Sequence, residues 1–236
     1  MDTSGFKQHY SHQFNTELEE VRSRILTMGG LVEQQLRTAI GALNRGYSDP
    51  AAAVASNDIK VNAYDVEIDE RCTQILALRK PNASDLRLVL AVIKMTADLE
   101  RIGDEAKRVA RMALRAPNSE PGLNLFSQIT HLGSQVQGML HRVLDAFARM
   151  DVDAAIAVAH EDVDIDREYE SIIRQSMTYM MEDPRTIPSV MDLIWAARAL
   201  ERIGDRCCNV SEHIIYCVKG KDVRHTSLEK IRKEFG

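Results

Sequence analysis

A six-residue segment, Leu-Glu-Arg-Ile-Gly-Asp, occurs twice in this chain of 236 residues, at Leu99–Asp104 and at Leu200–Asp205. Chance seldom places two identical hexapeptides in a chain of this length, so we interpret them as an internal repeat, which sets the architecture of a protein. The length suits two units of roughly 115 residues each. We therefore expect two halves of similar structure.

Between turn-forming segments, the apolar residues recur at helical spacing. From Leu99 to Val109 they are separated by three, four and three positions, and the second hexapeptide opens a run with the same spacing. Clusters of Pro, Gly, Asn and Asp interrupt the pattern, and no segment alternates as a strand does. We expect helices over about 15–46, 50–79, 84–115, 123–149, 151–182 and 187–218, with Asp49 and Ser84 as N-caps of the second and third.

Short loops between long helices imply antiparallel neighbours. The predicted fold class is therefore all-α, with two tandem antiparallel three-helix bundles related by the internal repeat. The apolar fraction of 44% with only 5% aromatic residues is typical of such bundles. We expect domains over 1–118 and 119–220, followed by a polar, solvated C-terminal tail over 221–236.

Charge and composition exclude several classes of function. A net charge of −5 argues against nucleic-acid binding, which usually needs a basic surface. The polar segment Met1–Gln13 does not resemble a signal peptide, and no apolar run reaches the ~20 residues of a membrane span. Catalytic motifs such as H-E-x-x-H, G-x-S-x-G or a P-loop do not occur. We expect a cytoplasmic protein, not an enzyme, that reaches the membrane only through partners.

Each hexapeptide carries two carboxylates four residues apart, Glu100 with Asp104 and Glu201 with Asp205. On a helix such residues are neighbours, and their repulsion costs a few tenths of a kcal/mol. Helical geometry places both pairs away from the apolar seam, so an ordinary solvated acidic face is one interpretation. Because the same cost occurs twice, we favour a cation site, since carboxylates bind Mg²⁺, Mn²⁺ and iron.

The middle helix of each half supplies a second pair of candidate ligands. Asp58 and Asn62 correspond to Asp162 and Asp166 at an offset of 104 positions, whereas the hexapeptides differ by 101. An alternative alignment, at an offset of 97, would match Asp65–Asp69 with the second-half pair instead, but it needs a four-residue insertion elsewhere. The expected metal-binding residues are therefore Asp58, Asn62, Glu100, Asp104, Asp162, Asp166, Glu201 and Asp205. Because one of them is a neutral amide, we expect the second-half site to be stronger.

Two further residue types recur inside the hexapeptides. Arg101 and Arg202 can bind phosphate or a partner's anion, because guanidinium matches such groups bidentately, or they can pair with the nearby carboxylates. Gly103 and Gly204 each destabilise a helix by roughly 1 kcal/mol, which predicts the close approach of a neighbouring helix or a partner.

Several features together resemble the PhoU family over roughly residues 14–220. They are Met28-Gly29 in the first helix, Ser84-Asp85-Leu86-Arg87 opening the third, the two hexapeptides, and Tyr179-Met180-Met181-Glu182-Asp183-Pro184. The resemblance implies tandem three-helix bundles whose acidic motifs bind Fe, Zn, Mn or Mg. It also implies a negative regulator of phosphate uptake and of the phosphate-starvation response. Such proteins couple the ATPase subunit of the high-affinity phosphate ABC transporter to a sensor histidine kinase, and homodimers are common.

The chain departs from the motif of that family at a few positions. Asn62 stands where an acid is expected, and Glu105 and Arg206 replace a His that often follows the motif Asp. Arg108 replaces an Asn that the second half retains as Asn209. These departures again predict weaker metal binding in the first half. The alternatives to a regulator are a cytoplasmic metal or phosphate store, an adaptor protein, or a metal-dependent enzyme.

Overall fold

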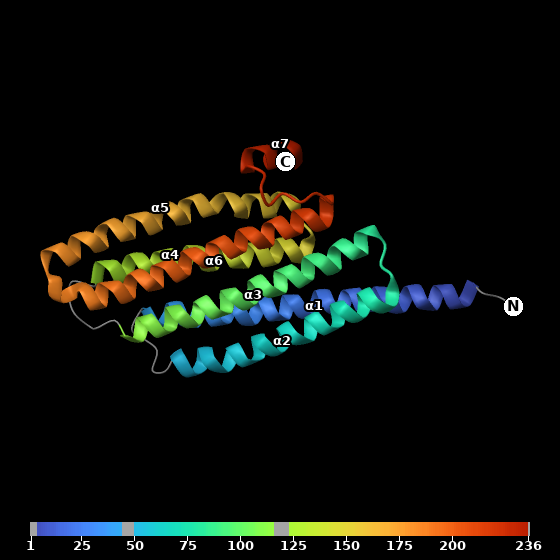
Figure 1. Ribbon diagram of the computed structural model, residues 1–236, viewed down its shortest axis with the longest axis horizontal. Helices are drawn as coiled ribbons and strands as arrows, with labels where there is room; N and C mark the ends of the chain where they lie inside the picture. Colours follow the sequence, from blue (N-terminus) through green and yellow to red (C-terminus); the bar gives the residue numbers. More distant parts are fainter. Residues whose placement is uncertain (1–3, 44–49, 116–122, 236) are drawn as a thin grey trace.

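The computed structural model describes residues 4–43, 50–115 and 123–235, and the regular structure of these residues is entirely helical (Figure 1). This confirms the predicted fold class. The elements are α1 (Ser4–Leu43), α2 (Pro50–Arg79), α3 (Ala83–Arg115), α4 (Leu123–Arg149), α5 (Val152–Glu182), the short 3₁₀ turn η2 (Pro184–Thr186), α6 (Ile187–Lys219) and α7 (Leu228–Phe235). No helix among the described residues is long and apolar enough to cross a membrane.

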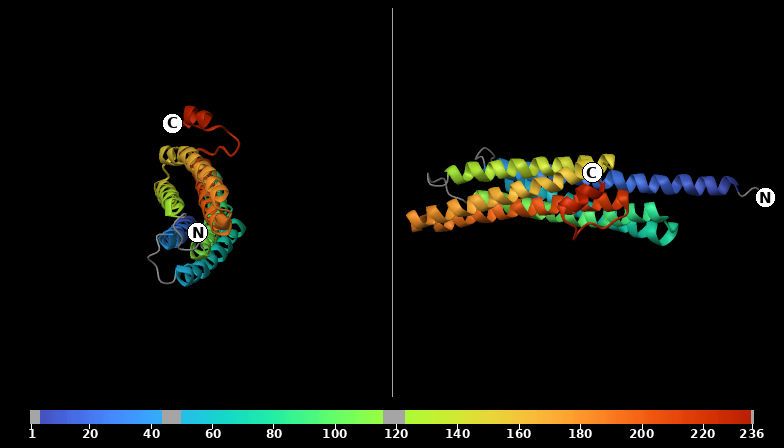
Figure 2. Two further views of the ribbon diagram at one scale, coloured as in Figure 1. Left: turned by 90° about the vertical axis from the view of Figure 1, so that its left-hand side faces the viewer. Right: turned by 90° about the horizontal axis from the view of Figure 1, so that it is seen from above.

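The helices form two elongated bundles that lie side by side (Figures 1 and 2). One contains α1, α2 and α3, and the other contains α4, α5 and α6. The bundles join along α3 and α6 and also along α1 and α4, so that a single apolar core extends through both. The N-terminal turns of α1 project beyond the end of the bundles (Figure 2).

Polar caps set the boundaries of α3 and α5. The Asp151 side chain caps α5 by accepting a hydrogen bond from the Ala154 amide at 2.9 Å, and Asp183 ends the same helix. The third helix differs from expectation, because its cap is Asn82 rather than Ser84: the Asn82 Oδ1 accepts from the Ser84 amide at 3.2 Å and from the Asp85 amide at 3.3 Å. Asn and Ser are about equally good N-caps, so composition alone does not choose between them.

Two other predictions concern residues outside the described ranges. The Asp49 cap of the second helix and the domain boundary at 118/119 both fall there.

The first helix begins earlier than predicted, at Ser4 instead of about 15. Its apolar spacing is weak at the start, which is why the sequence pattern missed this extension.

The C-terminal segment packs against the second bundle. The sequence predicted a polar, solvated tail, and this prediction is wrong. Val223 and Ile231 are buried, at 1% and 2% exposure. The helix α7 contacts α5, and Figure 1 shows it on the outer side of that bundle. Two apolar residues among many charged ones anchor this segment because both are buried in the apolar core.

A symmetric pair of glycine contacts joins α1 to α4. A Cβ atom at Gly29 would lie 2.6 Å from a methyl of Leu144, and one at Gly133 would lie 2.9 Å from Ile40. Gly133 follows Gly29 by 104 positions, and Leu144 follows Ile40 by the same number. The internal repeat therefore extends to the contact between the two halves, where each half inserts an apolar side chain against a glycine of the other.

This contact predicts opposite effects for two adjacent glycines in α1. We expect Gly29→Ala to lower the free energy of unfolding by about 1–3 kcal/mol, because the added methyl overpacks the contact with Leu144. Gly30→Ala should raise it by up to about 1 kcal/mol, because Gly30 faces open space and Ala favours the helix. Urea unfolding followed by circular dichroism measures both. Equal effects of the two changes would contradict the glycine contact.

Candidate functional site

The second-half candidates lie on two adjacent helices. Asp162 and Asp166 come from α5, and Glu201 and Asp205 come from α6. Burial raises the pKa of Asp162 to about 6, with further upward contributions from the charges of Asp166 and Asp205. Burial also raises the pKa values of Glu201 and Asp205. The structure therefore brings together four acids whose negative charges oppose one another.

Gly204 of α6 allows α5 to pack closely against α6 at this cluster. A Cβ atom there would lie only 2.9 Å from Asp162 Oδ1 and 3.3 Å from Ile165. In the first half, a Cβ atom at Gly103 would meet Gln35 and Val61 at an ordinary 3.7 Å. The expected close approach of a helix is thus found in the second half, whereas a methyl group would fit in the first.

The same contacts decide between the two alignments of the middle helices. Val61 faces the glycine of the first hexapeptide and Ile165 faces that of the second, and these two residues are 104 positions apart. The geometry agrees with the preferred offset of 104 and not with 97.

Glu201 is buried, at 8% exposure, so an ordinary solvated acidic face, one of the two interpretations, does not describe this member of the pair. The reason is that α6 is enclosed by α3, α4 and α5. Arg198 donates a hydrogen bond to Oε1 of Glu201. Within the described part of the chain, Oε2 of Glu201 and Oδ1 of Asp162 are buried without a hydrogen-bond partner. A buried carboxylate oxygen without a partner is costly, and a bound cation would remove that cost.

The first-half candidates are arranged differently. The Lys107 ammonium lies 2.8 Å from a carboxylate oxygen of Asp58 and 2.6 Å from one of Asp104. The Asn62 amide donates to Asp58 at 3.5 Å. Burial, together with the charges of Asp104 and Asp65, raises the pKa of Glu100. Asp65 is therefore close to the first-half site, although the preferred alignment gave it no role.

The carboxylates of the second half fit a divalent cation by chemistry but are not already gathered around one point. Among the described residues, no group of three or more His, Cys, Asp and Glu side chains is arranged to hold a metal ion. Hard cations accept oxygen ligands from several carboxylates. Binding would therefore require the carboxylates of α5 and α6 to rotate toward a common centre.

The recurring arginines occupy different environments. Arg202 pairs with Glu105 of the first half at 3.2 Å, so it bridges the two bundles instead of pairing with its own motif. Arg101 has an exposed side chain. Its binding to an anion or a partner stays a prediction.

A buried polar cluster between α3 and α6 was not predicted from the sequence. Asp98 has only 5% exposure and accepts a hydrogen bond from Asn209 Nδ2 at 3.2 Å. Arg206 approaches the same carboxylate at 3.5 Å, and His213 Nε2 lies 3.2 Å from its other oxygen. The sequence feature that could have revealed this cluster is the acid Asp98, directly beside the apolar seam of its helix. This cluster holds the two halves in register.

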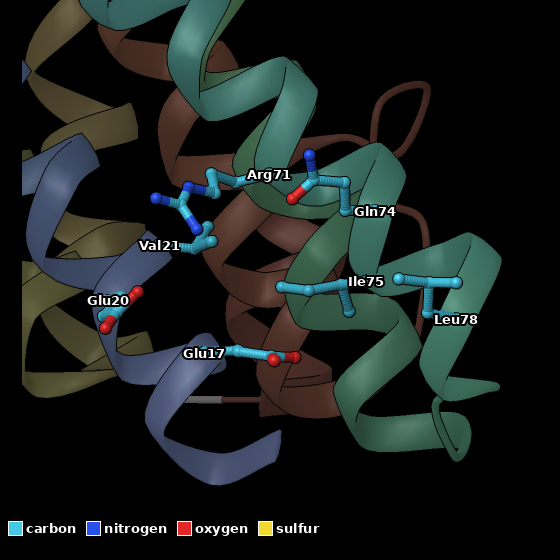
Figure 3. Close-up of a pocket in the computed structure, with 7 residues that line it drawn as sticks. All are labelled: Glu17, Glu20, Val21, Arg71, Gln74, Ile75 and Leu78. Carbon is cyan, nitrogen blue, oxygen red and sulfur yellow. The ribbon is translucent and has the colours of Figure 1, made fainter. Parts of the chain in front are cut away.

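Two cavities differ in their relation to the acidic residues. One, of about 210 Å³, lies between the second bundle and the C-terminal segment and is lined by Asp162, Cys208, Glu212, Thr226, Ile231 and three apolar residues. Figure 3 shows a smaller one, between α1 and α2, and its volume is about 60 Å³. Glu17, at its edge, pairs with Arg79. The larger cavity adjoins the second-half acids and is the better candidate for function.

The raised pKa of Asp162 predicts how stability depends on pH in the presence of a chelator. A carboxyl group whose pKa rises from 3.8 to about 6 on folding destabilises the folded state as pH increases between these values. We expect Asp162→Asn to stabilise the metal-free protein by about 1–2 kcal/mol at pH 7 to 8, allowing for partial exposure, and to have little effect near pH 4. Urea unfolding across this pH range is the measurement.

The exposed Asp164 on the same helix provides a control for this prediction. Asp164 pairs with Arg167 on the surface, at 72% side-chain exposure. Its change to Asn should leave the pH dependence as in the wild type. A wild-type stability that does not fall between pH 4 and pH 6 relative to Asp162→Asn would contradict the electrostatic strain.

Comparison with known proteins places this geometry among well-defined relatives. A family model described as the PhoU domain matches the chain twice, over residues 25–113 and 129–214. The phosphate-specific transport system accessory protein PhoU of Escherichia coli strain K12 is 51% identical over 233 residues, which cover 99% of this chain and 96% of that protein. The protein of the same name from Serratia marcescens is 52% identical over the same shares.

Solved structures agree with the sequence matches. The crystal structure of PhoU from Pseudomonas aeruginosa superposes with a TM-score of 0.84 at 50% identity, covering 88% of this chain and 100% of that one. The phosphate transport system regulatory protein PhoU from Streptococcus pneumoniae gives a TM-score of 0.81 at 29% identity, covering 89% and 99%.

Proposed function

This chain belongs to the PhoU family, and we propose that it is the accessory protein of a phosphate-specific transport system that restrains phosphate uptake and the phosphate-starvation response. The observation that carries the proposal is the 51–52% identity to proteins of that name along 99% of this chain. The relatives named above are called accessory or regulatory proteins, not enzymes, which agrees with the sequence analysis.

In this role the protein acts by contact. Its partners are the ATPase subunit of the phosphate ABC transporter and the sensor histidine kinase of the phosphate response, and a second copy of the chain forms a homodimer with it. The protein is cytoplasmic and reaches the inner membrane through these partners. The continuous core through both bundles supports such a role, because it makes the molecule one rigid element that can touch two partners at once.

The metal site we propose consists of Asp162, Asp166, Glu201 and Asp205, which bind a divalent or iron cation. The unpartnered buried oxygens of Glu201 and Asp162 support it, as do the raised pKa values of three of these acids. Hard carboxylate ligands suit Mg²⁺, Mn²⁺ and iron, and Zn²⁺ also accepts them. The bound ion would neutralise the cluster and fix α5 against α6.

A regulatory role predicts a defined result in cells. In cells that lack this chain and grow with abundant phosphate, we expect a transcriptional reporter of phosphate starvation to be switched on, because the repressing contact is missing. Expression of the wild-type chain should switch it off again. A reporter that stays off without the chain would exclude the signalling role and favour a storage function.

The metal site has its own prediction. We expect Glu201→Ala combined with Asp205→Ala to remove most of the bound Mn²⁺ or Fe²⁺, because half of the proposed ligands are lost. Metal content after dialysis, measured by mass spectrometry of the protein, tests this. The control is Asp164→Ala with Glu170→Ala, which removes two exposed acids of α5 and should leave the metal content unchanged. Equal metal content in all three proteins would refute the site, whereas many ions per chain would indicate a store.

A further inference from the structure

The two halves carry different residues at one equivalent position next to the acids. Lys107 follows the first hexapeptide by three positions, and Cys208 follows the second hexapeptide by three. The structure places both side chains against the corresponding acid of the middle helix, Lys107 against Asp58 and Cys208 against Asp162. The internal repeat thus presents the same site with a cation in one half and a neutral thiol in the other.

The ammonium of Lys107 bridges the two helices of the first-half site. Asp58 on α2 lies 2.8 Å from Nζ, and Asp104 on α3 lies 2.6 Å from it. Burial tends to lower the pKa of this ammonium, but its hydrogen bonds to Asp104 and Asp58 outweigh that effect and raise the pKa. The ammonium of Lys107 is thus held between two carboxylates and compensates their negative charge.

The second half lacks such compensation at the same point. Cys208 carries no positive charge and offers Asp162 only a hydrogen bond, whose lowering effect on the pKa of that acid is smaller than the raising effect of burial. Arg198 pairs with Glu201 through one carboxylate oxygen and leaves the other unpartnered among the described residues. The carboxylates that lack a neutralising cation are therefore mainly those of the second half.

We infer that Lys107 takes the place of a metal ion in the first half, so that only the second half binds an external cation. The inference rests on the metal role proposed above and adds a residue that decides which site is open. A divalent cation at the first-half site would meet the ammonium within the same pair of carboxylates, and like charges at such a distance repel strongly. Removal of the ammonium leaves Asp58, Asp104 and Glu100 free to bind a cation.

The test is Mn²⁺ binding to the full-length protein, measured by calorimetry and by metal content after dialysis. For Lys107→Gln, which removes the charge and shortens the side chain by one atom, we expect about twice the Mn²⁺ bound per chain compared with wild type. The added binding should disappear when Asp104→Asn is combined with it. The control Lys60→Gln removes an exposed lysine of α2 and should bind as wild type does.

A second variant covers the case in which Lys107→Gln does not fold. Lys107→Cys gives the first half the residue that the second half already carries, and circular dichroism establishes whether each variant is folded. It should also gain Mn²⁺ binding. In the background of Glu201→Gln and Asp205→Asn, wild-type Lys107 should leave almost no binding, and either Lys107 variant should restore it.

The outcomes separate this inference from the proposed function. If the wild type binds Mn²⁺ through Glu201 and Asp205 and neither Lys107 variant gains any, the inference fails while the metal role stands. A second result would also overturn the inference. This is Mn²⁺ binding by the Glu201→Gln, Asp205→Asn protein that still carries Lys107, if the further change Asp104→Asn abolishes that binding. If only the Lys107 variants bind Mn²⁺, Lys107 closes the first-half site as inferred, but the second-half site fails. No binding by any of these proteins would refute both.

Discussion

The antiparallel contact between α3 and α6 is the interaction on which the rest of the structure depends. Each of these helices belongs to its own bundle and also packs against the other, so one apolar core serves both halves. The Asp98 carboxylate lies inside this contact and accepts a hydrogen bond from Asn209. Any other register of α3 against α6 would leave this buried carboxylate without its partner, which costs free energy. Because both hexapeptides lie on these two helices, the contact also fixes where their carboxylates point.

Identical hexapeptides acquire different chemistry from their surroundings. In the first half, Lys107 satisfies two carboxylates and closes the site as an ion pair. In the second half, Gly204 lets Asp162 lie close to α6. Burial and the negative charges of Asp166 and Asp205 then disfavour the ionised form of Asp162. A buried acid with a raised pKa reduces the stability of the protein, and such strain is typical of positions that bind a ligand. The repeat therefore supplies two copies of one scaffold, and the single difference between Lys107 and Cys208 beside it gives the two copies different charge.

Much of this molecule could be predicted from its sequence, and the exceptions have physical causes. Apolar spacing and turn residues located six helices to within a few residues, except at the start of α1, where the spacing is weak, and they missed α7, which lies in the segment predicted to be a solvated tail. The cap of α3 moved from Ser84 to Asn82 because both residues cap well. The candidate ligands were found through the repeat. Asp65 was left out because only the rejected alignment, at an offset of 97, gives it a counterpart in the second half, and the cluster around Asp98 was missed because Asp98 has no acidic counterpart there.

By itself, the sequence determined the helices, the internal repeat, the family and the eight candidate ligands, because all of these depend on local spacing or on motifs that a linear chain displays. Only the tertiary structure decided that Glu201 is buried, that Val223 anchors the C-terminal segment, and that one ammonium reaches two carboxylates. These outcomes depend on contacts between distant residues, such as the 49 positions that separate Lys107 from Asp58. The burial and charge that such contacts create are properties of the packed helices, and no local pattern encodes them.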